Sequence, residues 1–566
     1  MVHTDAFLRV RRRKKLISNG GLTAHRKRKA RLAMGKPFIL KYRYADKYYI
    51  YDVNSNCVLE VDKALFTVIN HVEITGDSPV PVAGEKLQGV ARVASLSDES
   101  VNKALGTISD AYANKGLFSD RRPTAMRYPF TKEDLRIIVS STLCRLILGI
   151  TESCNLRCTY CKYSGSYQYA RQHSNTQMTE ATAHKAVRFL MDHSGYIINE
   201  TNEPISITFY GGEPFINFRL IKSCVSFVEE HYPERRERVL FALTSNFTMP
   251  RQEILEFLAK NQIDLTVSVD GPQILHDRYR VSARGKGSFE RLKRNLERLR
   301  KIDEKYYDEK VAFSIVITPP YDLETVVDFF EHDDLVGGHL LFVSYADRSY
   351  TTFYDRFDMN TERKALFGQL DRLRTRFDEG VKSGSLPPRS PLTAFTSGAL
   401  RYVVQRPVGR LGSVIFPNGV CVPGAHRTFV TPDGKLYMCE RIGETVPIGD
   451  LESGYDMDSI DQALQRYIAI SEDDCRNCWA VRFCGACFIA GLKGSEFCGV
   501  SKQKFCSAQR QDMLVALKQY SELVAANAKA LNNVFPPAEV MSTLDLAKGC
   551  LAHHKQVATA AGTVAA

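Results

Sequence analysis

From residue 145 to residue 345 the sequence alternates between short apolar runs and amphipathic helical segments. The apolar runs have the length of strands, and they lie at 146–151, 205–210, 239–244, 265–270, 311–318 and 339–345. Helical periodicity falls between them, at 179–194, 216–231, 251–260, 288–303 and 323–332. Six such units in succession predict an α/β fold with a parallel sheet covered by helices. We expect the active site at the carboxyl ends of these strands.

The cysteines are distributed unevenly. Of the fifteen, three lie in 154–161 and eight in 421–506, while Cys57, Cys144, Cys224 and Cys550 are scattered. The chain begins without the apolar run and cleavage site of a secretory signal. Clustered cysteines in such a chain favour metal ligation in a reducing compartment over a disulfide framework. We interpret the scattered four as buried or incidental thiols.

The first cysteine group has the spacing C-x3-C-x2-C, with Cys154, Cys158 and Cys161 following the first predicted strand. Three thiolates on one loop can hold three irons of a [4Fe–4S] cluster and leave the fourth open to an outside ligand. A structural zinc site closes with four ligands, and this loop contains no His. The spacing therefore favours an iron–sulfur cluster.

Two motifs beside this loop resemble the radical S-adenosylmethionine (SAM) superfamily. Tyr160 directly precedes Cys161, and Gly211-Gly212-Glu213 follows the second predicted strand. The resemblance implies that Tyr160 lies against the adenine of SAM. It also implies that the Gly-Gly-Glu motif receives the methionyl amino group, with glycines that allow close approach and a carboxylate that accepts from the ammonium.

The segment 267–289 looks like the corresponding stretch of sulfatase maturases and peptide maturases. This likeness implies that Ser268 contacts the ribose of SAM and Arg280 its carboxylate region. We interpret Asp270 and His276 as residues that order the loop. The superfamily implies a partial (β/α)6 TIM-like barrel over residues 140–350. It also implies a 5′-deoxyadenosyl radical that abstracts hydrogen from the substrate.

The second cysteine group contains enough thiolates for two [4Fe–4S] clusters, although its paired C-x2-C spacings also allow two zinc sites. Its members are Cys421, Cys439, Cys475, Cys478, Cys484, Cys487, Cys498 and Cys506. Residues 411–510 resemble the SPASM domain, which carries auxiliary clusters in radical SAM maturases. By that resemblance Cys475, Cys478, Cys484 and Cys506 hold one cluster, and Cys421, Cys439 and Cys487 hold the other.

The fourth ligand of the second of these clusters is open. Either Cys498 completes it, or one iron is left free for a substrate thiolate. Glu440 follows Cys439, where sulfatase maturases carry an Asp that acts as a base. Glu440 is therefore our candidate catalytic base; the alternative is a surface or cluster-neighbour glutamate.

Residues 37–125 are expected to form a small α+β module, winged-helix-like, with strands near 38–44, 47–53 and 57–61 and helices over 62–72 and 98–115. The stretch 51–62 resembles the peptide-recognition element of peptide maturases. Strand edges in such a module can bind a leader peptide as an added strand.

The remaining segments carry less information. Residues 1–36 contain twelve Lys or Arg and a single acid, so this basic arm accounts for almost all of the net charge of +12. We interpret it as a solvated tail, with a nucleic-acid partner as the less favoured alternative. A mixed helical linker is expected at 351–410, a C-terminal helix at 511–535 and an Ala-rich tail at 536–566. No stretch is apolar enough to cross a membrane, and a cytoplasmic protein is expected.

Together these features predict a radical SAM enzyme that modifies a ribosomally made precursor peptide, forming a thioether or carbon–carbon crosslink. The expected cofactors are SAM, its [4Fe–4S] cluster and two auxiliary [4Fe–4S] clusters, with flavodoxin or ferredoxin as reductant. One alternative is a sulfatase-type maturase that makes formylglycine, although such enzymes generally lack an N-terminal module. Another is an RNA-modifying enzyme docked by the basic arm. A plain electron carrier would leave the Gly-Gly-Glu motif unexplained.

Overall fold

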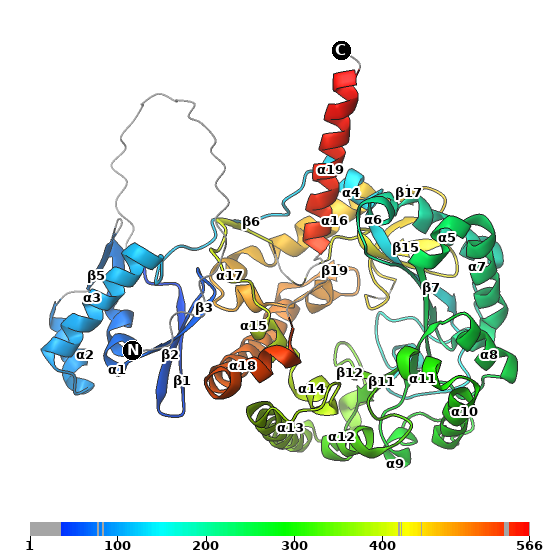
Figure 1. Cartoon of the computed structure of the whole chain (residues 1–566), viewed down its shortest axis with the longest axis horizontal. Coiled ribbons are helices and arrows are strands. Elements are labelled where there is room, and N and C mark those ends of the chain that lie inside the picture. Colours follow the sequence, from blue (N-terminus) through cyan, green and yellow to red (C-terminus); the bar gives the residue numbers. More distant parts are fainter. Residues whose placement is uncertain are drawn as a thin grey trace.

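The computed structural model describes residues 35–75, 78–81, 84–416, 419, 421–442, 444–536 and 543–564. Nearly all of the predicted basic arm and part of the Ala-rich tail lie outside these residues. Figure 1 shows the β/α units at one end of the molecule and the N-terminal module at the other, with the cysteine-rich region between them. None of the helices in the described residues is long and apolar enough to span a membrane.

All six predicted parallel strands are present, and their ends differ from the predictions by three residues at most. They are β7 (Leu143–Thr151), β8 (Ile205–Gly211), β9 (Val239–Ser245), β10 (Asp264–Ser268), β11 (Val311–Ile317) and β12 (Leu340–Tyr345). They pair in chain order, with β12 at the open end of the sheet. This confirms the α/β class and the parallel sheet.

Helices connect these strands as predicted. The five long ones are α5 (Glu180–Asp192), α7 (Phe218–His231), α8 (Gln252–Lys260), α10 (Phe289–Ile302) and α12 (Leu323–His332). Shorter ones were not predicted, namely α6 (Gly195–Glu200), α9 (Gln273–His276) and α11 (Glu304–Lys310).

The two faces of this sheet differ, so the strands are not apolar along their whole length, as the apolar runs in the sequence had suggested. Large side chains such as Phe209, Phe241 and Phe313 are at most 2% exposed and belong to the main core. The opposite face carries small polar residues that are partly exposed, namely Ser206, Thr208, Thr244, Thr266, Ser268 and Ser314. One face therefore packs on the helices, and the other borders a solvent-accessible interior.

The cysteine-rich region extends the same sheet, which the sequence did not predict. Strand β14 (His426–Val430) pairs in parallel with β7, and β15 (Lys435–Tyr437), β16 (Pro447–Asp450) and β17 (Gly454–Tyr455) follow antiparallel. The sheet thus has ten strands. Since β7 also leads into the first cysteine loop, β14 lies beside the strand that positions that loop.

The rest of this half of the chain is mainly helical. Its elements are α13 (Met359–Ser383), α14 (Pro391–Thr396), α15 (Gly398–Val404), α16 (Met457–Ala469), α17 (Glu472–Arg476), α18 (Gly499–Val534) and α19 (Thr543–Val564), with the short strands β13 (Val414–Ile415), β18 (Leu492–Lys493) and β19 (Glu496–Phe497). Helix α18 begins well before residue 511, so the predicted C-terminal helix is longer than expected.

The N-terminal module contains the three predicted strands, β1 (Ile39–Tyr44), β2 (Lys47–Asp52) and β3 (Cys57–Val61), as an antiparallel sheet. Asp62 caps α1 (Lys63–Val68), and Gly116, at φ 64°, ends α3 (Asp98–Lys115). Helix α1 and the 3₁₀ helix that continues it over Ile69–His71 together cover the predicted helix. The hairpin of β4 (Val72–Thr75) and β5 (Ser78–Pro81) follows before α2 (Gly84–Val93). Strand β6 (Ala125–Met126) and α4 (Lys132–Val139) lead to β7, the first strand of the parallel sheet.

One face of the module's sheet is covered by the C-terminal half of the chain. Tyr42, Tyr49 and Tyr51 are buried in one cluster with Met513 and Leu517 of α18. The Tyr42 hydroxyl also lies 2.7 Å from Ser521 Oγ. The module is therefore docked through β1 and β2.

Candidate active site

The three cysteines of the first group come together on the loop after β7. Backbone N–H groups of Leu156 and Tyr163 donate to the sulfurs of Cys154 and Cys161, each at 3.4 Å. Burial raises the pKa of Cys154 to about 11 and that of Cys158 to about 12. Each of the three thiols contributes to the pKa shift of another, so the loop brings them into one group.

The Gly-Gly-Glu motif holds this loop by its backbone. The N–H groups of Gly212 and Glu213 donate to the carbonyl oxygens of Thr151 and Ser153, at 2.8 and 2.9 Å. A Cβ atom on Gly211 would lie 2.1 Å from the Thr151 oxygen, and one on Gly212 would lie 2.2 Å from the Ser153 oxygen. The structure therefore requires these glycines for close approach to the cysteine loop, whereas the motif alone suggested close approach to the ligand.

The carboxylate of Glu213 is fully buried. One oxygen accepts from Ser245 Oγ at 2.8 Å and the N–H of Phe215 at 3.2 Å, and the other accepts from the N–H of Asn246 at 2.8 Å. Burial raises its pKa to about 7. Glu213 thus joins the ends of β8 and β9, and its predicted contact with an ammonium group stays a prediction.

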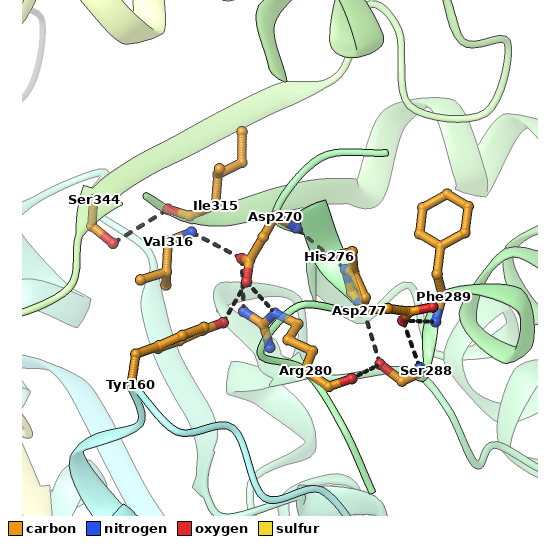
Figure 2. A network of polar contacts seen from close by, with 10 residues as sticks. All are labelled: Tyr160, Asp270, His276, Asp277, Arg280, Ser288, Phe289, Ile315, Val316 and Ser344. Atoms are coloured by element: carbon orange, nitrogen blue, oxygen red, sulfur yellow. Dashed lines mark hydrogen bonds and ion pairs between the residues drawn. The ribbon is translucent and has the colours of Figure 1, made fainter. Parts of the chain in front are cut away.

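Tyr160 and Arg280, predicted from separate motifs, meet at Asp270 (Figure 2). The Asp270 carboxylate accepts from the Tyr160 hydroxyl at 2.5 Å and from Arg280 Nε and Nη2 at 2.8 and 3.1 Å. The N–H of Val316 on β11 donates to it at 3.0 Å. The Arg280 and Asp270 side chains are 8% and 7% exposed. Asp270 therefore joins the cysteine loop, its own loop and β11.

His276 lies beside Asp270 and joins it to Ser288 (Figure 2). Ser288 donates its hydroxyl proton to the carbonyl oxygen of Arg280 at 2.7 Å, so His276 Nε2, 3.0 Å away, must donate to Ser288. The N–H of Asp270 points to His276 Nδ1 at 3.4 Å. The ring is thus a neutral Nε2–H tautomer, and burial lowers its pKa to about 4. This agrees with its interpretation as a loop-ordering residue.

Two further residues complete this end of the sheet. Ser268 ends β10 and pairs with Ser314 on the partly exposed inner face, where a contact with ribose remains a prediction. Asn246 Nδ2 lies 2.8 Å from Asn155 Oδ1 and 3.8 Å from Cys154 Sγ. The sequence signal for Asn246 was its position directly after β9.

Within the second group, four cysteines come together: Cys475, Cys478, Cys484 and Cys506. Burial raises the pKa of Cys484 to about 11, and the other three thiols add to that shift. The ammonium of Lys502 lies 3.4 Å from Cys475 Sγ and 3.8 Å from Cys506 Sγ. This is the set that the SPASM resemblance assigns to one cluster.

The SPASM resemblance assigns Cys421, Cys439 and Cys487 to the other cluster. Cys487 contributes to the pKa shift of Cys421, and both Cys421 and Cys439 act on the pKa of Arg427. Cys498 is half-buried and is the residue directly before α18, with no capping hydrogen bond from its side chain. The groups that lower its pKa are Ser501, Val500 and Lys493, and no cysteine is among them. The division of these cysteines into two clusters, and the place of Cys498 in either, stay predictions.

Glu440 lies between the first cysteine loop and the second group. Its side chain is 13% exposed, 3.8 Å from Arg427 and 3.6 Å from Arg441. Burial, with smaller contributions from Glu440 and Cys161, raises the pKa of Tyr210, on the inner face of β8, to about 12. A direct contact joins the two regions here, because Lys162 Nζ donates to the Arg441 carbonyl at 3.4 Å.

The sulfur atoms fit cluster ligation. Four predicted ligands, Cys154, Cys161, Cys439 and Cys484, accept a backbone N–H from the second residue after them, at 3.3–3.4 Å. Three of the scattered cysteines, Cys57, Cys144 and Cys550, donate to carbonyl oxygens, and Cys439 also donates, to Glu440 Oε2 at 3.3 Å. In the described residues, no three Cys, His, Asp or Glu side chains are arranged to bind one metal ion.

Comparison with known proteins agrees with this site. Residues 148–332 match the sequence model of the Radical SAM superfamily. The chain is 28% identical over 166 residues, 29% of its length, to a cysteine-type anaerobic sulfatase-maturating enzyme of Clostridium novyi, of which 42% is covered. It is 26% identical over 206 residues, 35% of its length, to the radical SAM cyclopropyl synthase TigE of Paramaledivibacter caminithermalis, of which 41% is covered.

The alignments therefore span less than half the length of these two relatives. A solved structure of native anSMEcpe with bound AdoMet superposes with a TM-score of 0.47 at 19% identity, covering 69% of this chain and 100% of that one.

Proposed function

Because residues 148–332 are a radical SAM domain, we propose that the chain modifies a ribosomally made precursor peptide and forms a thioether or carbon–carbon crosslink. Forming such a crosslink removes two hydrogens from the peptide. One leaves by abstraction, and the other leaves as a proton and an electron. The observation that carries the proposal is the pairing of β14 with β7. This pairing sets a strand of the cysteine-rich region beside the strand that leads into the first cysteine loop, which supports a role of that region as electron acceptor.

The residues of the first site would hold a [4Fe–4S] cluster and SAM. Cys154, Cys158 and Cys161 would be the cluster ligands, and Tyr160, Gly211, Gly212, Glu213, Ser268 and Arg280 would surround SAM. When bound, these cofactors supply a 5′-deoxyadenosyl radical as hydrogen acceptor. The chain's own contribution is to orient them, because Asp270 fixes both Tyr160 and Arg280 in buried positions.

In the second group, Cys475, Cys478, Cys484 and Cys506 would close one auxiliary cluster. Cys421, Cys439 and Cys487 would hold another, with either Cys498 as its fourth ligand or one iron left open. An open iron suits a substrate thiolate. Glu440, next to Cys439 and facing the first loop, would take the proton that leaves the peptide.

The N-terminal module would bind the leader of the precursor. Its β1 and β2 face is covered by α18, whereas β3 pairs only with β2 in the described sheet. A leader peptide added to β3 would gain main-chain hydrogen bonds without displacing the module.

The test uses short peptides encoded beside the gene, deuterated in their core residues, with SAM and dithionite under anaerobic conditions. Peptide modification predicts deuterium in 5′-deoxyadenosine and a peptide that has lost a hydrogen pair. Deuterium transfer that needs the N-terminal module supports leader binding. No transfer from any such peptide contradicts the proposal.

The second candidate is formylglycine formation, which the identity to a sulfatase-maturating enzyme favours. It predicts an aldehyde in a sulfatase-derived peptide that carries Cys or Ser, with no need for residues 37–125. Removal of residues 1–36 distinguishes peptide modification from the RNA alternative. If the enzyme modifies RNA and docks through the basic arm, loss of the arm should abolish both activity and its salt dependence.

A further inference from the structure

We propose that Lys502 sets the reduction potential of the auxiliary cluster held by Cys475, Cys478, Cys484 and Cys506. The positive charge of its ammonium group would stabilise the reduced form of that cluster. The inference rests on the part of the proposed function that places a cluster on these cysteines.

Lys502 is a buried cation whose close polar partners are sulfurs. It is 2% exposed, and its ammonium group lies 3.4 Å from Cys475 Sγ and 3.8 Å from Cys506 Sγ. The ring of Tyr467 lies 6.0 Å away. No salt bridge joins Lys502 to a carboxylate in the described part of the chain.

The helix geometry makes this placement specific. Lys502 and Cys506 are four residues apart in α18 and therefore share one face. The same helix turn delivers a predicted ligand and the cation that contacts it. Because a buried ammonium is costly unless it is paired, negative charge on the sulfurs is the partner that the site requires.

Reduction adds one electron, and thus one negative charge, to a cluster. A fixed positive charge against two of its ligand sulfurs favours that form and raises the potential, since cluster potentials depend on net charge and on hydrogen bonds to sulfur. The other auxiliary set offers an internal reference, because its neighbouring cation, Arg427, lies 3.8 Å from the carboxylate of Glu440.

The experiment is an electron paramagnetic resonance redox titration of the full chain, reconstituted with iron and sulfide, on a Cys154→Ala/Cys158→Ala/Cys161→Ala background that removes the first cluster. Lys502→Met should lower the midpoint potential of one cluster by at least about 59 mV, a tenfold change in the reduction equilibrium. Lys504→Met, on the exposed side of the same helix, should leave both potentials unchanged. Lys502→Arg should stay near the wild-type value.

An unchanged potential in Lys502→Met with full iron content would overturn the inference. If Lys502→Met fails to load iron, the midpoint potential is measured in Lys502→Gln, which keeps a hydrogen-bond donor but no charge. An unchanged potential in that variant would overturn the inference equally. Failure of the cluster assignment looks different. Iron content would then be the same in Cys475→Ala as in the parent chain, and both the assignment of a cluster to these cysteines and the role of Lys502 would be wrong.

Discussion

The two cysteine regions of the molecule are assembled in different ways. Cys154, Cys158 and Cys161 lie on one loop after β7, and backbone N–H groups of the same loop hold two of the sulfurs. The C-terminal cysteines come from segments between Cys421 and Cys506, which meet only when β14 pairs with β7 and α18 reaches Cys475. A site encoded by local spacing needs little beyond its loop, whereas the second site needs the finished fold.

The largest expected effect is the loss of SAM cleavage when the first cysteine group is removed. Cys154→Ala/Cys158→Ala/Cys161→Ala should lose about four irons and all SAM cleavage, because no other predicted cluster has the Gly-Gly-Glu motif beside it. Iron analysis and chromatography of 5′-deoxyadenosine measure both. The matched control is Cys57→Ala/Cys144→Ala/Cys550→Ala, at scattered thiols that donate to carbonyls, which should keep both. Residual cleavage in the first variant would break the comparison.

A variant of the C-terminal cysteines tests the same comparison from the other side. Cys475→Ala/Cys484→Ala should also lose about four irons, yet SAM cleavage should continue, since the first loop forms without this set. Peptide crosslinking should fall, because one of the two proposed electron acceptors is lost. Measuring 5′-deoxyadenosine and modified peptide in one reaction checks this; loss of both products together would mean that the two sites are not independent.

Within the first site, the buried pair of Asp270 and Arg280 carries the next largest effect. Asp270→Ala leaves a buried guanidinium unpaired, so the free energy of unfolding should fall by about 3–5 kcal/mol and SAM affinity by at least tenfold. Tyr160→Phe removes a single hydrogen bond to the same carboxylate and should cost about 1–3 kcal/mol. Denaturant unfolding and equilibrium dialysis with SAM measure the two. Equal effects of the two variants would contradict a central position for Asp270.

The smallest effect concerns pH. His276 has a folded-state pKa of about 4, below the ordinary 6.5, so the unfolded chain binds its proton first and stability falls as pH drops through this window. Between pH 7.5 and 5.5 the wild type should lose about 1 kcal/mol of unfolding free energy that His276→Gln retains. Denaturant titrations of both proteins at the two pH values check this; parallel losses would show that His276 is not held neutral.

The sequence predicted the local features well. The apolar runs located all six parallel strands because burial against helices selects for them. The spacing of Cys154, Cys158 and Cys161 located the first group because these residues share one loop. The motifs around Tyr160 and Arg280 singled out two residues that meet at Asp270, while their predicted contacts with SAM stay predictions.

Features that depend on contacts between distant segments were missed. Strand β14 carries no signal that it pairs with β7, and its partner lies far away in the chain. Asp270 could be read as a loop residue, but its bond to Tyr160 exists only in three dimensions. Lys502 looks like a surface lysine, because nothing in its neighbours along the helix reveals its burial. The hairpin of β4 and β5 was missed because Pro79 and Pro81 disguise the second strand.

The most direct test of radical chemistry at the first cysteine loop is anaerobic reconstitution of the full chain, followed by iron and sulfide analysis and incubation with SAM and dithionite. Three clusters and a SAM-cleaving site predict about twelve irons per chain together with 5′-deoxyadenosine. Zinc in place of iron, or full iron content without 5′-deoxyadenosine, would contradict it.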